Sequence, residues 1–527
     1  MLFNIIETIA VVLSCVAASI HFVHVFQMER YQLPVYNQWM SRSRESYFQK
    51  NVLVGIMAAV IKWYLPMLLS LFSSVEATRN AIAGWMTLIG YLAVTTALTV
   101  RDIRTPMRRP LVLTMRARRL FGAITLIHAV LVLLMKLLSF PPYLVYAVIP
   151  YAVWLAGHIM HPVEEKINSR FYDEAMKKLE ERDDLIKIGI TGSYGKTLTK
   201  FILKEILSSK YEVLATPASF NTAMGISRVV NDQLEEKHQV FIAEMGAQHV
   251  GDIKHLVKLV KPRYGLITSI GDEHKDSFGS MANIVDTKYE LVSGLPEDGV
   301  AFFASDNGYL DRMYGMCKHE KYSASLDMPG DRYMRASDVT VDSEGTRFAL
   351  ECADGGRVRC RTRLLGRYNV QNIALAAAVA HRLGLTMDEI AAGIARLQPF
   401  ERRLQLIPGE CTVIDDTYND HPQGTADALG VMAEFTGRRL IVTPGLPQTE
   451  VNGEDVNYVF GKQMLDCVDA VILVGEKKKL RSVVKGLKDA GFPRGAIRIV
   501  ADMGEAESLL AEVSRPGDII LYECEVQ

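Results

Sequence analysis

A glycine-containing turn that ends in a lysine and a threonine is the part of the sequence best suited to bind phosphate. Its informative positions are Thr191, Gly192, Ser193, Gly195, Lys196 and Thr197. The turn lies between an apolar run at 185–190, typical of a buried strand, and an amphipathic run at 197–209, typical of a helix. At such a helix start, backbone N–H groups face an anion, the lysine reaches terminal phosphates and the threonine hydroxyl can hold Mg²⁺. The pattern indicates a phosphate-binding loop. A chance glycine-rich turn is the alternative, because Ile190 stands where the usual pattern has a glycine.

Two more polar residues follow apolar segments that the sequence predicts as strands. Glu244 follows the run at 239–243, and His274 follows the run at 264–270. Ligands bind at the carboxyl ends of strands in open α/β sheets, so Glu244 is a candidate Mg²⁺ ligand and His274 a candidate metal-binding residue. The alternatives are an ordinary strand-end carboxylate and a structural histidine.

The composition divides the 527 residues into a basic, apolar N-terminal third and an acidic remainder. Residues 1–160 carry 14 basic and 5 acidic side chains, and residues 161–527 carry 45 and 55. Together with a mean hydropathy of +0.10, this excludes a simple soluble enzyme, a disordered chain and a small disulfide scaffold. The acidic body also argues against nucleic acid as a partner. Seven cysteines without a Cys-x-x-Cys pair indicate reduced thiols.

Five apolar stretches in the N-terminal third are long enough, or nearly so, to cross a hydrocarbon core of about 30 Å. They are 3–27, 52–71, 81–100, 121–140 and 141–159. The loops 28–50 and 101–120 hold four and seven basic residues. The positive-inside rule therefore predicts that both loops and everything after residue 160 are cytoplasmic, with the N-terminus outside. Five spans satisfy this and four do not. We expect a multi-pass plasma-membrane protein with a cytoplasmic catalytic body.

Basic residues in and near the expected spans each have two interpretations. Lys62 and Lys136 lie inside apolar runs, where a charge costs a few kcal/mol or more. They either snorkel to an interface or contact an anionic lipid headgroup. The arginines of loop 101–120 either set the topology only or also form a phosphate-binding surface.

Seven motifs in the C-terminal two thirds resemble those of the Mur ligase family, the ATP-dependent amide ligases of peptidoglycan precursor synthesis. Thr-Gly-Ser-Tyr-Gly-Lys-Thr is similar to that family's TGxxGKT, Glu-Met-Gly-Ala to E[LM]GA, and Asp-Asp-Thr-Tyr-Asn to DDSYN. In chain order the motifs lie at 191–197, 216–221, 244–247, 270–280, 287–290, 366–372 and 415–419. The likeness is greatest to the D-alanyl-D-alanine-adding member.

The apolar stretches and the resemblance together predict a fold class and three domains. An α-helical membrane domain of about five helices at 1–160 would stand in place of the family's UDP-sugar-binding domain. The rest would be α/β: a P-loop central ATP-binding domain with a parallel-rich sheet at 161–403, and a smaller α/β C-terminal domain at 404–527.

The resemblance also implies a reaction that uses ATP and Mg²⁺. ATP phosphorylates a substrate carboxylate, an amine attacks the acyl phosphate, and an amide, ADP and phosphate leave. By the match, Lys196 and Thr197 would serve the phosphates and a first Mg²⁺, with Glu244 as its ligand. His274 and Lys288 would hold a second Mg²⁺, and Lys288 matches a lysine that is carbamylated in much of the family.

Further matched residues would bind the rest of the nucleotide. Asn369 and Asn372 would contact adenine, Arg403 the phosphates and Asp416 the ribose. Because the reaction brings anions together, the resemblance makes Arg403 a candidate catalytic residue beside Lys196, Lys288 and His274.

Departures from the family pattern concern the substrate more than ATP. Ala218 and Ser219 replace a Gly-Asn pair, and Glu523 stands where the family has a lysine near the end of the chain. We therefore expect a membrane-anchored ATP-dependent amide ligase that acts through an acyl phosphate in cell-envelope or lipid-linked polymer synthesis.

Three other functions remain open at this point. They are an anchored D-alanyl-D-alanine-adding ligase, a poly-amino-acid synthase-like ligase and a non-catalytic nucleotide-dependent membrane scaffold. The expected partners are a membrane lipid or lipid-linked precursor, a small amino-acid or peptide substrate and envelope-synthesis membrane proteins, with no nucleic acid.

Overall fold

The computed structural model forms two compact units, residues 1–170 and 171–527. The described residues are 2–42, 49–71, 75–104, 110–273, 275–305, 308–327, 332–342, 344–418, 422–447, 450–451 and 454–525. The domain bounds expected from the sequence stay predictions.

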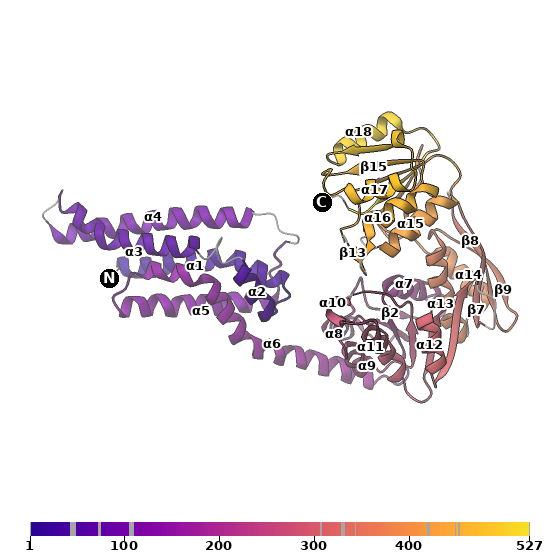
Figure 1. Cartoon of the computed structure of the whole chain (residues 1–527). Coiled ribbons are helices and arrows are strands. Elements are labelled where there is room, and N and C mark those ends of the chain that lie inside the picture. Colours follow the sequence, from indigo (N-terminus) through magenta and orange to yellow (C-terminus); the bar gives the residue numbers. More distant parts are fainter. Residues whose placement is uncertain are drawn as a thin grey trace. The chain divides into compact units, whose positions relative to one another are not determined.

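The first unit is helical, and five of its segments are long and apolar enough to cross a membrane. Four of them are α1 (Leu2–Met28), α3 (Gln49–Leu69), α4 (Glu76–Arg104) and α5 (Met115–Leu137). The fifth combines the 3-10 helix η2 (Pro142–Val148) with α6 (Ile149–Glu180), and a short helix α2 (Leu33–Arg42) follows α1. In Figure 1, α1, α3, α4 and α5 run alongside one another. The five predicted apolar helices are therefore present, as candidate spans.

A buried carboxylate lies among these helices and pairs with both lysines of the apolar runs. Glu7 of α1 is 1% exposed. Its carboxylate forms an ion pair with Lys62 and lies 2.9 Å from Lys136 Nζ. The Tyr143 hydroxyl donates a hydrogen bond of 2.9 Å to Glu7 Oε1. Neither snorkelling to an interface nor contact with a lipid headgroup fully accounts for the positions of these lysines, because both of them pair with a carboxylate inside the helical unit.

The second unit contains a nine-stranded sheet of order β2-β3-β1-β4-β5-β6-β7-β8-β9. Strands β2 to β7 pair in parallel, and β7, β8 and β9 pair antiparallel. In sequence order the strands are β1 (Ile186–Thr191), β2 (Val213–Ala215), β3 (Val240–Glu244), β4 (Tyr264–Ile267), β5 (Val300–Ala304), β6 (Glu320–Leu326), β7 (Met334–Asp342), β8 (Gly345–Cys352) and β9 (Arg357–Thr362).

Helices cover both faces of this sheet, because its central strands are apolar on both sides. The helices are α7 (Lys196–Leu207), α8 (Ala223–Gln233), α9 (Asp252–Val260), α10 (Lys275–Phe278), α11 (Met281–Ser293), α12 (Gly308–Met316), α13 (Arg367–Arg382) and α14 (Met387–Arg396). On β3, Val240 and Ile242 belong to the apolar cluster that includes α7, α13 and α14. Phe241 and Ala243 belong to the cluster that includes α8 and α9. This alternation is the two-residue period of a strand.

A second sheet has six strands in the order β10-β11-β17-β12-β15-β16, with β10 antiparallel to β11 and the other pairs parallel. Its strands are β10 (Gln405–Ile407), β11 (Thr412–Asp416), β12 (Arg439–Thr443), β15 (Ala470–Val474), β16 (Ile497–Val500) and β17 (Ile519–Glu523). Four helices accompany them: α15 (Pro422–Glu434), α16 (Val456–Gln463), α17 (Arg481–Asp489) and α18 (Met503–Val513). The short strands β13 (Glu450–Val451) and β14 (Glu454–Asp455) form a separate pair. The predicted fold class, helices followed by two α/β sheets of mainly parallel strands, is confirmed.

The strand order decides where a ligand can bind to the large sheet. Strand β1 lies between β3 and β4, so the chain leaves β1 in one direction and returns on its other side. Such a reversal opens a crevice at the carboxyl ends of the strands, where ligands bind in open α/β sheets. The phosphate loop after β1, Glu244 at the end of β3 and the segment after β4 meet there.

Candidate active site

The loop between β1 and α7 needs glycine at two positions. Gly195 precedes α7 with a φ of 80°, and a Cβ there would lie 2.6 Å from Tyr368 Oη and 2.7 Å from Asn372 Oδ1. Gly192 has a φ of 149°, and a Cβ there would lie 2.1 Å from Thr268 Oγ1. Both positions combine a backbone conformation that favours glycine with a close neighbour. The loop is therefore packed tightly from two sides.

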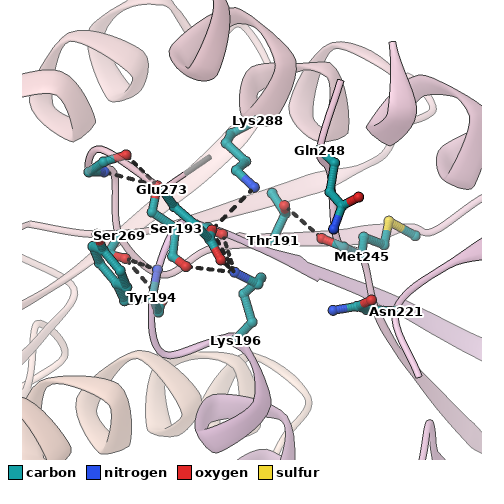
Figure 2. A network of polar contacts seen from close by, with 12 residues as sticks. Thr191, Ser193, Tyr194, Lys196, Asn221, Met245, Gln248, Ser269, Glu273 and Lys288 are labelled. Atoms are coloured by element: carbon teal, nitrogen blue, oxygen red, sulfur yellow. Dashed lines mark hydrogen bonds and ion pairs between the residues drawn. The ribbon is translucent and has the colours of Figure 1, made fainter. Parts of the chain in front are cut away.

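Hydrogen bonds fix the loop to the ends of the neighbouring strands (Figure 2). Thr191 Oγ1 donates to the carbonyl of Met245, at 2.9 Å. The Ser193 amide donates to the carbonyl of Ser269, at 2.9 Å, and the Tyr194 amide donates to Ser269 Oγ, at 2.8 Å. Because these partners follow β3 and β4, the loop takes its shape from the sheet.

The Lys196 side chain folds back over the loop. Its ammonium group donates to the carbonyls of Gly192 and Ser193, at 2.7 and 2.6 Å. It also pairs with the Glu273 carboxylate, 3.1 Å away (Figure 2). Lys196, which the sequence motif assigns to phosphate binding, therefore pairs with a carboxylate beside the loop.

Glu244 has both of its oxygens engaged by neighbouring side chains. Oε1 accepts hydrogen bonds from Thr197 Oγ1, at 3.0 Å, and from Asn221 Nδ2, at 3.2 Å. Oε2 lies 2.8 Å from Lys200 Nζ, and both residues of this ion pair are buried. Burial lowers the pKa of Lys200, while the neighbouring Glu244 acts in the opposite direction.

The donor set at this point fits Mg²⁺. A hydroxyl and a carboxylate oxygen, 3.0 Å apart, are hard oxygen ligands of the kind that Mg²⁺ takes beside phosphate oxygens and water. Lys200 neutralises the second carboxylate oxygen, which leaves Oε1 as the oxygen that faces the hydroxyl. The chemistry of Thr197 and Glu244 thus agrees with their expected role as metal ligands.

Lys288 lies on α11 close to the same centre. It is 1% exposed, and its Nζ lies 3.9 Å from Glu273 Oε2 (Figure 2). Burial, and next the nearby charge of Lys196, lower the pKa of Lys288 to about 8. A neutral amine is therefore accessible near physiological pH, and a neutral amine is what carbamylation requires.

Two residues of this centre were not singled out from the sequence. Glu273 lies between the ammonium groups of Lys196 and Lys288, and Lys200 holds Glu244. A signal existed for Lys200, because it lies four residues after Lys196 on the buried side of an amphipathic helix, where a lysine needs a partner. For Glu273 no local pattern distinguished it from an ordinary loop acid.

The asparagines expected near adenine lie at the start of α13, beside the loop. Asn372 Oδ1 accepts a hydrogen bond of 3.0 Å from Thr199 Oγ1 on α7. Asn369 Nδ2 donates to the carbonyl of Leu365, at 2.7 Å. The structure therefore brings Asn372 to the phosphate-loop helix.

The other nucleotide-binding candidates lie at the start of the second sheet. Asp416 Oδ1 accepts a hydrogen bond of 2.8 Å from the Leu404 amide. The Arg403 guanidinium lies over the Tyr418 ring, 4.5 Å from its centre. Both contacts join residues beside β10 and β11. His274 lies outside the described residues.

In the segment before Asn221, Ala218 stands where the family motif has a glycine. Ala218 has a φ of 43°, in the left-handed region that an alanine adopts only at a cost. Its carbonyl accepts a hydrogen bond from Lys200. Ala218 therefore has a backbone conformation that normally favours glycine.

Comparison with known proteins gives a consistent result. A model of the Mur ligase middle domain matches residues 190–380, and a model of the Mur ligase glutamate ligase domain matches residues 402–523. The UDP-N-acetylmuramoyl-tripeptide--D-alanyl-D-alanine ligase of Escherichia coli (strain K12) is 30% identical over 304 residues, 57% of this chain and 67% of that protein. The enzyme of the same name from Mycobacterium tuberculosis (strain ATCC 25618 / H37Rv) is 30% identical over 359 residues, 64% of this chain and 69% of that protein.

Solved structures show the same fold. MurF from Acinetobacter baumannii matches with a TM-score of 0.60 and 24% identity, over 68% of this chain and 77% of its own. A MurF ligase from Thermotoga maritima in complex with ADP matches with a TM-score of 0.60 and 22% identity, over 68% and 80%.

The chain belongs to the Mur ligase family. Members of this family are ATP-dependent, ADP-forming amide ligases that use Mg²⁺, and the chain is an enzyme of this class.

Proposed function

We propose that this Mur ligase is anchored in the plasma membrane, with its catalytic body in the cytoplasm, and acts on a lipid-linked substrate of cell-envelope synthesis. The observation that carries the catalytic part is the grouping of Lys196, Thr197, Glu244 and Lys288 around one loop. The membrane part rests on five apolar helices and on the basic loops between them.

Residues of this chain then have separate tasks. Thr197 Oγ1 and Glu244 Oε1 would hold Mg²⁺, which when bound neutralises phosphate charge. Lys196 would leave Glu273 and bind the terminal phosphate of ATP. There its positive charge would stabilise the negative charge that develops as the phosphoryl group is transferred. Lys288, once carbamylated, would hold a second Mg²⁺ together with His274, for the substrate carboxylate. Asn369 and Asn372 would contact adenine, Arg403 the phosphates and Asp416 the ribose.

The proposed lipid-linked substrate gives the helical unit a task. A single helix already anchors a protein essentially irreversibly, so five exceed what anchoring requires. At the end of the bundle that the charge pattern predicts to be cytoplasmic, Arg116 lies over the Tyr31 ring, 4.2 Å from its centre, and Arg118 is exposed. Arg119 is engaged by Glu164 through two hydrogen bonds of 2.7 and 2.8 Å. Arg116 also lies 3.9 Å from Glu164, so the exposed Arg118 is better placed than Arg116 and Arg119 to meet a diphosphate. Arg108 and Arg109 lie outside the described residues.

A second candidate function is the addition of D-alanyl-D-alanine, which the names of the matched relatives favour. Glu523, which replaces the family's lysine, weighs against it. Its side chain is buried at the end of β17 and accepts a hydrogen bond of 2.8 Å from Thr425. With a buried acid at this position, the chain lacks the positive charge that the family's lysine would supply there.

The test is ADP release by the full chain in lipid nanodiscs, with a screen of amino acids and dipeptides. Lys196→Ala is expected to abolish release, while Lys204→Ala, at an exposed position of the same helix, is expected to retain it. Undiminished release by Lys196→Ala would overturn the catalytic assignment.

The membrane part has its own test. Arg118→Gln is expected to raise the KM for a lipid-linked substrate without changing the KM for ATP, and Arg79→Gln is the control. Equal use of the lipid-linked substrate and its water-soluble nucleotide analogue would overturn the lipid proposal and leave the ligase assignment intact.

A further inference from the structure

A cluster of three metal-ligating side chains lies at the antiparallel edge of the large sheet. Cys352 ends β8, Asp354 lies in the turn before β9, and His381 lies near the end of α13. One ligand atom from each of the three lies within 4.8 Å of the other two. A thiol, an imidazole and a carboxylate are the ligand types of zinc sites.

The distances within the cluster agree with tetrahedral zinc. Cys352 Sγ lies 3.6 Å from His381 Nδ1. Bonds of about 2.3 Å from zinc to sulfur and about 2.05 Å to nitrogen, at the tetrahedral angle, place those two atoms about 3.6 Å apart. The thiol and the imidazole are therefore already at the separation that one shared ion requires.

The other neighbours orient the imidazole. His381 Nε2 lies 3.4 Å from Asp354 Oδ2, and the Tyr333 hydroxyl lies 2.8 Å from Nδ1. A proton on Nε2, facing the carboxylate, leaves the Nδ1 lone pair directed at Tyr333 and Cys352. Because Asp354 is exposed, its carboxylate can turn from Nε2 and join an ion on the Nδ1 side.

This cluster is separate from the nucleotide site. Both lie along α13, but His381 is nine residues after Asn372, about 13.5 Å along the helix at 1.5 Å per residue. The side chains differ as well, because the nucleotide site offers oxygen ligands for a hard cation. Thiolate selects softer ions such as Zn²⁺ over Mg²⁺.

We propose that Cys352, His381 and Asp354 bind one Zn²⁺, with water in the fourth position. The ion would be held by Cys352 Sγ, His381 Nδ1 and an Asp354 oxygen. Binding replaces the thiol proton, which leaves to solvent, and displaces the hydrogen bond between Tyr333 and Nδ1. The bound ion connects the β8–β9 turn to the end of α13, the helix that starts at the nucleotide site.

Cobalt provides a spectroscopic test that is independent of ligase activity. The full chain, reduced and in excess Mg²⁺, is titrated with Co²⁺ and then with Zn²⁺. We expect one tight Co²⁺ per chain with a thiolate-to-cobalt absorption band, and we expect one equivalent of Zn²⁺ to remove that band. Excess Mg²⁺ occupies the oxygen site, and only a cysteine ligand produces the band.

Variants assign the ligands. Cys352→Ser is expected to lose the thiolate band, His381→Gln to lose tight binding, and Asp354→Asn to weaken it by at least about 10-fold, since even the loss of an outer-shell partner costs that much. Cys360→Ser, at a buried thiol of β9, is the matched control and should bind normally. If Cys352→Ser does not fold, His381→Gln and Asp354→Asn decide the outcome. Absence of tight Co²⁺ binding by the wild type, or the same band in Cys352→Ser or His381→Gln, would overturn the proposal.

Discussion

Lys200 Nζ lies 2.8 Å from Glu244 Oε2, and both side chains are buried beneath the phosphate loop. The pair joins α7 to the end of β3, because Lys200 lies one helical turn after Lys196 and Glu244 ends the strand. It also turns Glu244 so that Oε1 faces Thr197. Lys200 is therefore a positioning residue for the expected Mg²⁺ ligand.

Lys200→Met should destabilise the protein by about 3 kcal/mol, because removal of one partner leaves a buried carboxylate unpaired. Chemical denaturation measures the loss, and Lys204→Met at an exposed position is the control. The double variant Lys200→Met/Glu244→Gln should regain part of the stability, since the remaining charge is gone. Equal stability of the single and double variants would show that the two side chains are not coupled.

Lys288 should make stability depend on pH in a defined direction. Its pKa is about 8 in the folded protein and 10.5 ordinarily, so the unfolded chain binds the proton more tightly. The loss of stability caused by burying the charged amine is complete below pH 8 and disappears as the pH rises to 10.5. In CO₂-free buffer, Lys288→Met should be more stable than the wild type at pH 7, by about 3 kcal/mol at most, and inactive.

Urea denaturation of both proteins at pH 7 and pH 10 measures this difference. The comparison cancels other groups that titrate over the same range. A stability difference that does not change with pH would contradict the assigned pKa. Full activity of Lys288→Met would contradict its expected role at the metal.

Ala218→Gly should stabilise the protein slightly. A left-handed alanine costs about 1–2 kcal/mol, and glycine loses about 0.5–1 kcal/mol more entropy on folding, so the net gain is about 0.5–1 kcal/mol. Thermal or chemical denaturation measures it. Ala215→Gly, in the strand β2, is the control and should destabilise. A loss of stability in both variants would show that the φ of 43° at Ala218 is not strained.

Glu7→Gln should destabilise the helical unit, because it leaves Lys62 and Lys136 close together without a carboxylate. We expect a loss of about 3 kcal/mol or more, as for other broken buried ion pairs. Thermal unfolding in detergent, followed by helical circular dichroism, measures the loss. Glu76→Gln, at an exposed position of α4, should have little effect. Similar behaviour of the two variants would show that the Glu7 pairs contribute little.

Local features of this protein were predictable from the sequence, because they depend on neighbouring residues. The glycines of the loop, the strand before it and the helix after it follow from spacing and periodicity over about 25 residues. The five apolar helices follow from composition in the same way. Thr197 and Glu244 could be named because one opens a recognisable helix and the other ends a recognisable strand.

Contacts between distant segments were decided by the tertiary structure. Glu7 meets Lys62 and Lys136 only when three helices pack together. Glu273 comes between Lys196 and Lys288 because β4 lies beside β1 in the sheet. Periodicity shows which side of an element is buried, but it does not show which element covers that side. Strand order and helix packing supply that information, and with it the partner of each buried charge.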